Sequence, residues 1–146
     1  MCYQGRVDED EFGVRIFAGN VSDAYLMRRP PQPGYAVVTF RERHVADPTE
    51  MTAEEQAAWW ADIGIVARAI NDVYKPCHIN YEILGNSVPH AHVHLVPRYL
   101  DDPAPGRPLP NSSWQAASEL SSEQLKDQTS TLRSVMSQNA AHNRAS

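Results

Sequence analysis

Apolar residues along the chain recur at two spacings, and each spacing predicts a different element. Alternation with a period of two, rich in β-branched and aromatic residues, predicts strands, because every second side chain of a strand lies on the same face. Segments with this pattern are residues 14–18, 24–27, 35–40, 77–84 and 90–96. Short turns at residues 19–20 and 85–87 predict that the first two and the last two of these strands form hairpins.

A spacing of three and four residues predicts a long helix over residues 53–74. Thr52 and Glu55 form a capping box at its start, and Lys75-Pro76 ends it. Its expected apolar stripe consists of Trp60, Ile63, Ala67, Ile70 and Tyr74. Trp59, Ile65 and Val66 widen this stripe, so the helix is either deeply buried or also contacts a partner subunit.

Proline-rich segments at residues 28–34 and 101–110 predict surface loops, because proline removes a backbone donor and fixes φ. A final helix is predicted after Ser121, with Gln124 completing its cap. Its apolar residues are Leu125, Leu132, Val135 and Met136. We therefore expect an irregular lead-in over residues 1–12, one domain over 13–137, and a disordered polar tail over 138–146.

Composition narrows the function classes. The 146 residues carry a formal net charge of −5, which argues against binding a nucleic-acid polymer, since that requires a basic surface to replace counterions. Only two cysteines occur, so neither a disulfide framework nor a cysteine-rich zinc site is expected. No basic, apolar leader and no apolar segment of membrane-spanning length is found, which favours a cytoplasmic protein without a membrane partner.

The segment from Gly85 to Arg98 places His90, His92 and His94 at alternate positions among apolar residues. In a strand these three imidazoles share one face, at intervals of roughly 6.5 Å. Each ring brings two nitrogens that need polar partners when buried. Three interpretations follow: histidine ligands of a metal ion, a histidine nucleophile or base beside an anion site, and a polar core with all its hydrogen bonds satisfied.

The residues around this motif favour an anion. The turn before the histidines offers backbone N–H groups, the Asn86 amide and the Ser87 hydroxyl, all suited to phosphate oxygens. No carboxylate lies inside the motif, although a histidine that binds a metal usually needs such a hydrogen-bond acceptor. An acceptor could come from elsewhere in the chain, so the metal interpretation stays open.

Residues 90–96 resemble the His-φ-His-φ-His-φ-φ signature of the histidine triad (HIT) superfamily of nucleotide hydrolases and transferases. Residues 33–38, 43–45 and 52–74 are similar to the family's proline-glycine strand, basic-His turn and long helix. Asn80 lies ten residues before His90, close to the family's usual asparagine. This resemblance implies an α+β fold, with an antiparallel sheet of about five strands, one long helix and a C-terminal helix, usually paired as a homodimer.

The resemblance also implies a covalent mechanism without a cofactor or metal. His92 would attack the α-phosphorus of a dinucleoside polyphosphate or a nucleoside phosphoramidate and form a nucleotidyl-histidine intermediate. The backbone carbonyl of His90 would fix the tautomer of His92, and His94 would assist the leaving group. The expected phosphate contacts are Asn80, Asn86, Ser87 and Arg98.

The chain departs from the family pattern among the residues that would bind the nucleoside. Residues 27–29, Met-Arg-Arg, stand where relatives often carry the acid that holds the ribose hydroxyls. Arg28 and Arg29 either bind additional phosphates or are solvated at the surface. Two other functions compete with the enzyme: a nucleotide-binding sensor or scaffold with little turnover, and a metal protein with histidine ligands.

Overall fold

The computed structural model describes residues 7–145, with side chains described up to residue 140. The elements follow in the order β1 (Gly13–Ala18), β2 (Ser22–Met27), β3 (Ala36–Phe40), the 3-10 turn η1 (Pro48–Glu50), α1 (Ala53–Tyr74), β4 (His78–Glu82), β5 (His92–Arg98), α2 (Asn111–Gln115) and α3 (Ser122–Ala145). None of the helices described is long and apolar enough to cross a membrane.

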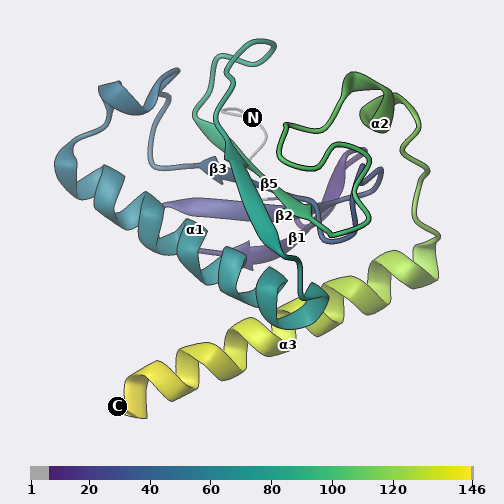
Figure 1. Cartoon of the computed structure of the whole chain (residues 1–146). Helices are drawn as coiled ribbons and strands as arrows, with labels where there is room; N and C mark the ends of the chain where they lie inside the picture. Colours follow the sequence, from purple (N-terminus) through teal and green to yellow (C-terminus); the bar gives the residue numbers. More distant parts are fainter. Residues whose placement is uncertain (1–6, 146) are drawn as a thin grey trace.

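The five strands form a single antiparallel sheet in the order β1-β2-β3-β5-β4 (Figure 1). The predicted hairpins are confirmed, because β1 pairs with β2 and β4 pairs with β5. β3 pairs directly with β5, although α1 and β4 lie between them in the sequence. The expected α+β architecture is therefore confirmed, and this long-range pairing brings β3 beside the histidine strand.

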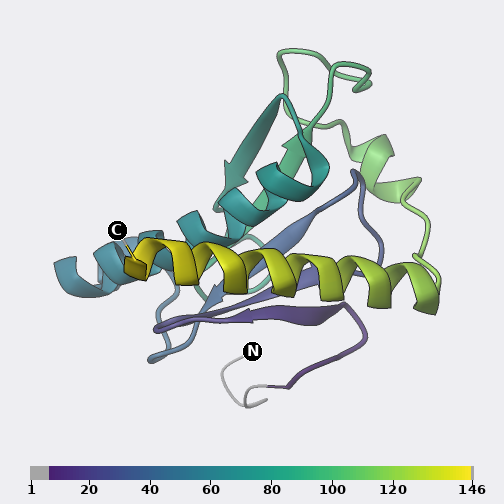
Figure 2. The same cartoon turned by 90° about the horizontal axis from the view of Figure 1, so that it is seen from below.

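α1 and α3 pack together, and α1 lies against the sheet at β2 while α3 lies against β1 (Figures 1 and 2). The core lies between these helices and the sheet face that carries Leu26, Val38, Val93 and Leu95. Alternate residues of the same strands face the other side. The candidate site lies on that second face.

The Thr52–Glu55 capping box is present at the start of α1, but the apolar stripe of the helix is rotated from the one expected. Trp59 is 1% exposed and makes an edge contact with Phe40, whereas Trp60 is 49% exposed and lies beside Tyr81. Placing Trp60 on the buried stripe was wrong. Two adjacent tryptophans fit the same apolar pattern, and only contact with the sheet decides between them.

The predicted disorder after residue 137 is wrong for the described residues, because α3 continues to Ala145. The Asn139 amide donates a 3.0 Å hydrogen bond to Asp72 on α1, and alanines in this segment favour helix. Residue 146 lies outside the described residues, as do residues 1–6 of the expected lead-in. Residues 7–12 contain no helix or strand beyond an isolated bridge between Glu9 and Val14.

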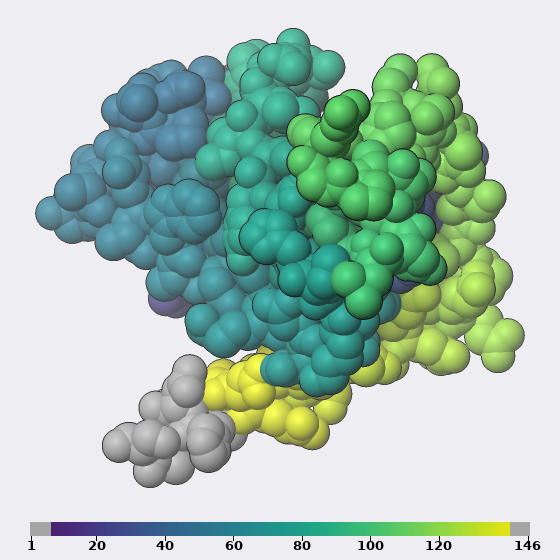
Figure 3. All heavy atoms as spheres, viewed as in Figure 1, coloured from purple at the N-terminus to yellow at the C-terminus, as the bar shows by residue number. Residues whose placement is uncertain are grey.

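The proline-rich segment after β5 has no regular structure until the short helix α2, which its sequence pattern did not predict. In the space-filling view this green segment lies beside the teal part of the chain that contains β4 and β5 (Figure 3). Leu109 and Trp114 from it pack with Tyr35, Val37 and Val96 in a second apolar cluster on the outer face of the sheet. The segment therefore forms one wall over the histidine strand.

Candidate functional site

A cavity of about 580 Å³ opens on the sheet face that points away from the helical core. All five strands or the turns that follow them contribute to its lining. The lining includes Gly13, Tyr25, Met27, Tyr35, Val37, Thr39, Arg41, Glu82, Asn86, Ser87, His92, His94, Asn111 and Trp114. The cavity thus extends from residues at β1 and β2 to the histidines of β5 and the turn after β4.

Strand register places the two cavity histidines in separate rows across the sheet. Thr39 pairs with both His92 and Asp23, so one row crosses β5, β3 and β2. His94 pairs with Val37 on one side and with Glu82 on the other. Because paired residues of adjacent strands lie on the same face, Thr39 and Glu82 flank the two imidazoles.

His92 is buried, and its ring orientation is fixed by the backbone just before its strand. Its Nδ1 lies 2.6 Å from the backbone oxygen of His90, and a carbonyl oxygen can only accept, so Nδ1 carries the proton. The lone pair is then on Nε2, the nitrogen available to the cavity. A neutral imidazole in this tautomer is a competent nucleophile or base near pH 7.

His90 does not share the cavity face with the other two histidines, so the expectation of three imidazoles on one face is wrong. β5 begins only at His92, and before it the chain departs from the strand alternation. The His90 ring is buried with Nε2 2.6 Å from the backbone oxygen of Phe40 and Nδ1 3.4 Å from Nδ1 of His44. Burial lowers the pKa of His90 below its ordinary value.

His94 lies beside His92, with ring centroids 4.9 Å apart and nearly perpendicular planes. Its Nδ1 is 2.6 Å from the hydroxyl of Tyr35, the residue just before β3. Burial, and secondarily the proximity of His92, lowers the pKa of His94 to about 4. The His94 ring is therefore neutral at pH 7.

The turn between β4 and β5 contributes the expected phosphate-binding groups. Asn86 and Ser87 are exposed and line the cavity together with Gly85 and Val88. Gly85 has a φ of 63°, a left-handed conformation that side chains rarely adopt. The amide, the hydroxyl and the backbone of this turn thus lie at the same opening as His92 and His94.

The structure does not bring Asn80 and Arg98 together with this group. Asn80 pairs with Val96 and Arg98 pairs with His78, farther along the strands, and both line a separate cavity under the proline-rich segment. The Arg98 guanidinium is also occupied, because Nη2 donates a 2.9 Å hydrogen bond to the buried carboxylate of Asp102. Spacing from His90 could not reveal this register.

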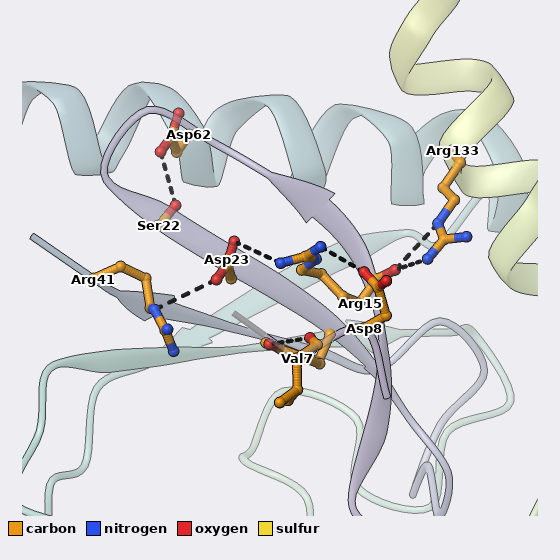
Figure 4. A network of polar contacts seen from close by, with 9 residues as sticks. Val7, Asp8, Arg15, Ser22, Asp23, Arg41, Asp62 and Arg133 are labelled. Atoms are coloured by element: carbon orange, nitrogen blue, oxygen red, sulfur yellow. Dashed lines mark hydrogen bonds and ion pairs between the residues drawn. The ribbon is translucent and has the colours of Figure 1, made fainter. Parts of the chain in front are cut away.

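Arg28 and Arg29, before the proline loop, are not among the described residues that line the cavity of His92 and His94. Arg28 pairs with Glu9 and donates to the backbone oxygen of Asp10, while Arg29 pairs with Glu119. These contacts favour a surface role for the two arginines over the binding of additional phosphates. A different arginine, Arg41, lines the cavity, and the fully buried carboxylate of Asp23 lies 3.4 Å from its Nε (Figure 4).

Sequence reasoning missed Tyr35, Thr39, Arg41 and Glu82 as lining residues. Strand alternation does place Tyr35 and Thr39 on one face, but only the β3–β5 pairing shows that this face carries His92 and His94. Trp114 also reaches the cavity, and its ring meets that of Tyr35 edge-on with centroids 5.1 Å apart. Within the described part of the chain, no three His, Cys, Asp or Glu side chains are grouped so that they could hold a metal ion.

A cavity over an antiparallel sheet, with two adjacent imidazoles at a strand and a polar turn before them, defines a class of small α+β proteins. The family model of the HIT domain matches residues 14–101. The chain therefore belongs to the HIT family.

Relatives and solved structures agree with this family. A bis(5'-adenosyl)-triphosphatase from Saccharomyces cerevisiae is 30% identical over 81 residues, which are 52% of this chain and 39% of the yeast protein. A histidine triad protein from Marinobacter aquaeolei has a TM-score of 0.75 at 21% identity, covering 86% of this chain and 90% of its own. A histidine triad protein from Bradyrhizobium japonicum has a TM-score of 0.74 at 24% identity, covering 84% and 90%. The chain thus matches about two fifths of the length of the yeast relative and nearly all of the two bacterial folds.

Proposed function

We propose that the protein is a nucleotide hydrolase or nucleotidyltransferase that acts at an α-phosphate through a covalent nucleotidyl-histidine. The observation that carries this proposal is the 2.6 Å hydrogen bond from His92 Nδ1 to the backbone oxygen of His90, which leaves the Nε2 lone pair for the cavity. The substrate class is a dinucleoside polyphosphate or a nucleoside phosphoramidate. The name of the yeast relative supports the first of these.

The chemistry proceeds in two displacement steps. Nε2 of His92 forms a bond to the α-phosphorus while the bond from phosphorus to the leaving group breaks. The leaving group takes that electron pair and the Nε2 proton of His94, while the hydroxyl of Tyr35 passes its proton to His94 Nδ1, so that the ring stays neutral. A water molecule then attacks the phosphorus and gives a proton to His94 Nε2, and the Nδ1 proton of His94 returns to Tyr35. The N–P bond breaks, and its electron pair returns to His92. An alcohol or phosphate in place of water would make the reaction a transfer.

The rest of the cavity suits the two parts of such a substrate. Asn86 and Ser87 offer hydrogen-bond donors to phosphate oxygens, and Arg41, which is paired with the buried Asp23, lines the cavity after β3. Phe12 and Met27 contribute apolar surface at the far end, where a nucleoside base would lie. Positioning of this kind, together with preorganised donors, supplies most of the catalysis of phosphoryl transfer.

We propose further that the protein works as a homodimer that pairs through the β4 edge of the sheet. β4 is an edge strand, and Trp60 and Tyr81 are both about half exposed with ring centroids 6.2 Å apart. Ile83 and Leu84 extend this exposed apolar surface. Sedimentation equilibrium should give twice the chain mass for the wild type, and Trp60→Glu should give the monomer; a monomeric wild type would contradict the proposal.

A rapid-quench experiment tests the catalytic proposal. Protein is mixed with α-labelled diadenosine triphosphate or an adenosine phosphoramidate and stopped in alkali, which preserves an acid-labile N–P bond. The wild type should carry label and turn over, whereas His92→Ala and His92→Gly should do neither. His78→Ala is the matched control, because His78 is exposed and lines the other cavity.

Two results would favour one of the two alternative functions over the proposed enzyme. Tight nucleotide binding, with no label and no hydrolysis that depends on His92, would indicate a sensor or scaffold. Stoichiometric zinc in protein purified without a histidine tag would indicate a metal protein.

A further inference from the structure

The hydroxyl of Tyr35 lies 2.6 Å from Nδ1 of His94, across the β3–β5 pairing. We propose that Tyr35 is a positioning residue that holds the proton of His94 on Nε2, so that His92 and His94 are kept in opposite tautomers. This inference rests on the proposed function for its catalytic meaning. The assignment of the tautomers themselves does not depend on that function.

The direction of the Tyr35–His94 hydrogen bond follows from what each partner can donate. In one arrangement the tyrosine O–H donates to Nδ1; in the other, Nδ1–H donates to the tyrosine oxygen. The first arrangement pairs the stronger donor with the stronger acceptor, because a phenol O–H is more acidic than a neutral imidazole N–H and an imidazole nitrogen is more basic than a phenol oxygen. The hydroxyl of Tyr35 therefore donates to Nδ1.

The surroundings keep both partners in the protonation states that this bond requires. Burial, with a smaller contribution from the Glu82 carboxylate, raises the pKa of Tyr35 and so keeps its proton on the hydroxyl. Burial lowers the pKa of His94, which keeps the ring neutral with only one N–H. The groups that face His94 are Tyr35 just before β3, Glu82 on β4 and His92 on its own strand.

Two adjacent histidines are therefore prepared for different tasks by different partners. A backbone carbonyl accepts from His92 Nδ1 and leaves the lone pair on Nε2. A tyrosine hydroxyl donates to His94 Nδ1 and leaves the proton on Nε2. The first ring can attack phosphorus and the second can protonate the leaving group, without any prior exchange of protons between them.

Nitrogen-15 NMR of the imidazoles in the wild-type protein tests the assignment directly. We expect the His92 ring to be protonated at Nδ1 and the His94 ring at Nε2 at pH 7. In Tyr35→Phe the two nitrogens of His94 should move toward each other in chemical shift as both tautomers become populated. A wild-type His94 protonated at Nδ1 would overturn the inference, whether or not the protein is an enzyme.

Kinetics separates a role in proton placement from a structural role. Tyr35→Phe should slow the hydrolysis of a nucleotide with an alkylamine or alcohol leaving group on the order of ten- to a hundredfold, because that group needs a proton to depart. The hydrolysis of a nucleotide p-nitrophenyl ester should keep nearly the same rate, because p-nitrophenolate leaves without a proton. Equal slowing of both substrates would overturn the inference.

A matched control is available in Tyr99→Phe. Tyr99 also donates its hydroxyl to another residue, the backbone oxygen of Pro33 at 2.8 Å, but it lines the other cavity. Tyr99→Phe should change neither the His94 tautomer nor the ratio between the two substrates. If the wild type hydrolyses neither substrate, the proposed function fails, and the NMR experiment alone decides the role of Tyr35.

Discussion

The carboxylate of Asp62, on α1, accepts a 2.8 Å hydrogen bond from the hydroxyl of Ser22, on β2, and both residues are buried (Figure 4). The backbone N–H of Val21 donates to the same carboxylate oxygen at 3.1 Å. A buried carboxylate is stable only with such donors around it. The long helix is thus fastened to the β1–β2 hairpin by a polar contact inside an apolar interface.

Asp62→Ala should lower the free energy of unfolding by about 3 kcal/mol, because it leaves a buried hydroxyl and backbone donors without their acceptor. Urea unfolding followed by circular dichroism measures this loss. The control is Asp72→Ala on the same helix, an exposed residue that accepts from Asn139, and it should cost less than about 0.5 kcal/mol. Equal losses in the two variants would contradict the role given to Asp62.

Lys75 ends α1 in the left-handed conformation, with a φ of 50°. Glycine adopts this conformation without the steric penalty of a Cβ, so Lys75→Gly should raise the free energy of unfolding by about 0.5–1 kcal/mol. Lys126→Gly makes the same substitution within α3 and should instead cost about 1 kcal/mol. Thermal unfolding of both variants checks the opposite signs; a loss at Lys75 would contradict the prediction.

The sequence predicted what local spacing controls. Period-two segments became strands, the Thr52–Glu55 box began α1, and the turn residues Asn86 and Ser87 lie at the cavity. What it could not predict depends on register between distant segments. Tyr35 contacts His94 only because β3 pairs with β5. Asn80 lies away from His92 and His94 because it pairs with Val96.

His90 shows the same limit within a single motif. Its spacing is identical to that of the other two histidines, yet the strand begins two residues later and the ring turns to the backbone oxygen of Phe40. Strand ends are set by which backbone groups find partners, and the side-chain pattern does not contain that information.

The two adjacent tryptophans of α1 give a direct test of which face of the helix is buried. Trp59→Ala should cost about 3–5 kcal/mol in the free energy of unfolding, because a fully buried ring leaves a cavity against Phe40. Trp60→Ala should cost less than about 1 kcal/mol in the isolated chain, since its ring is half exposed. Urea unfolding at low protein concentration, where any dimer has dissociated, measures both; a larger cost at Trp60 would contradict the packing.

The lowered pKa of His94 predicts how stability depends on pH. In the unfolded chain the ring takes up a proton near pH 6.5, whereas in the folded protein burial delays this to about pH 4. Between these values the unfolded state binds more protons, so the folded state loses stability as the pH falls from about 6.5 toward 4. The buried ring of His90, whose pKa is also lowered, acts in the same direction.

We expect His94 to account for a loss on the order of 1–2 kcal/mol between about pH 7 and about pH 5, after allowance for its partial exposure to solvent. His94→Gln removes the titrating ring, so its free energy of unfolding should fall less over the same range, with the remainder due to His90. Urea unfolding of the two proteins at several pH values gives both slopes. His78→Ala serves as the control, because its exposed imidazole should leave the wild-type slope unchanged. Parallel slopes for the wild type and His94→Gln would show that burial of His94 does not carry the pH dependence.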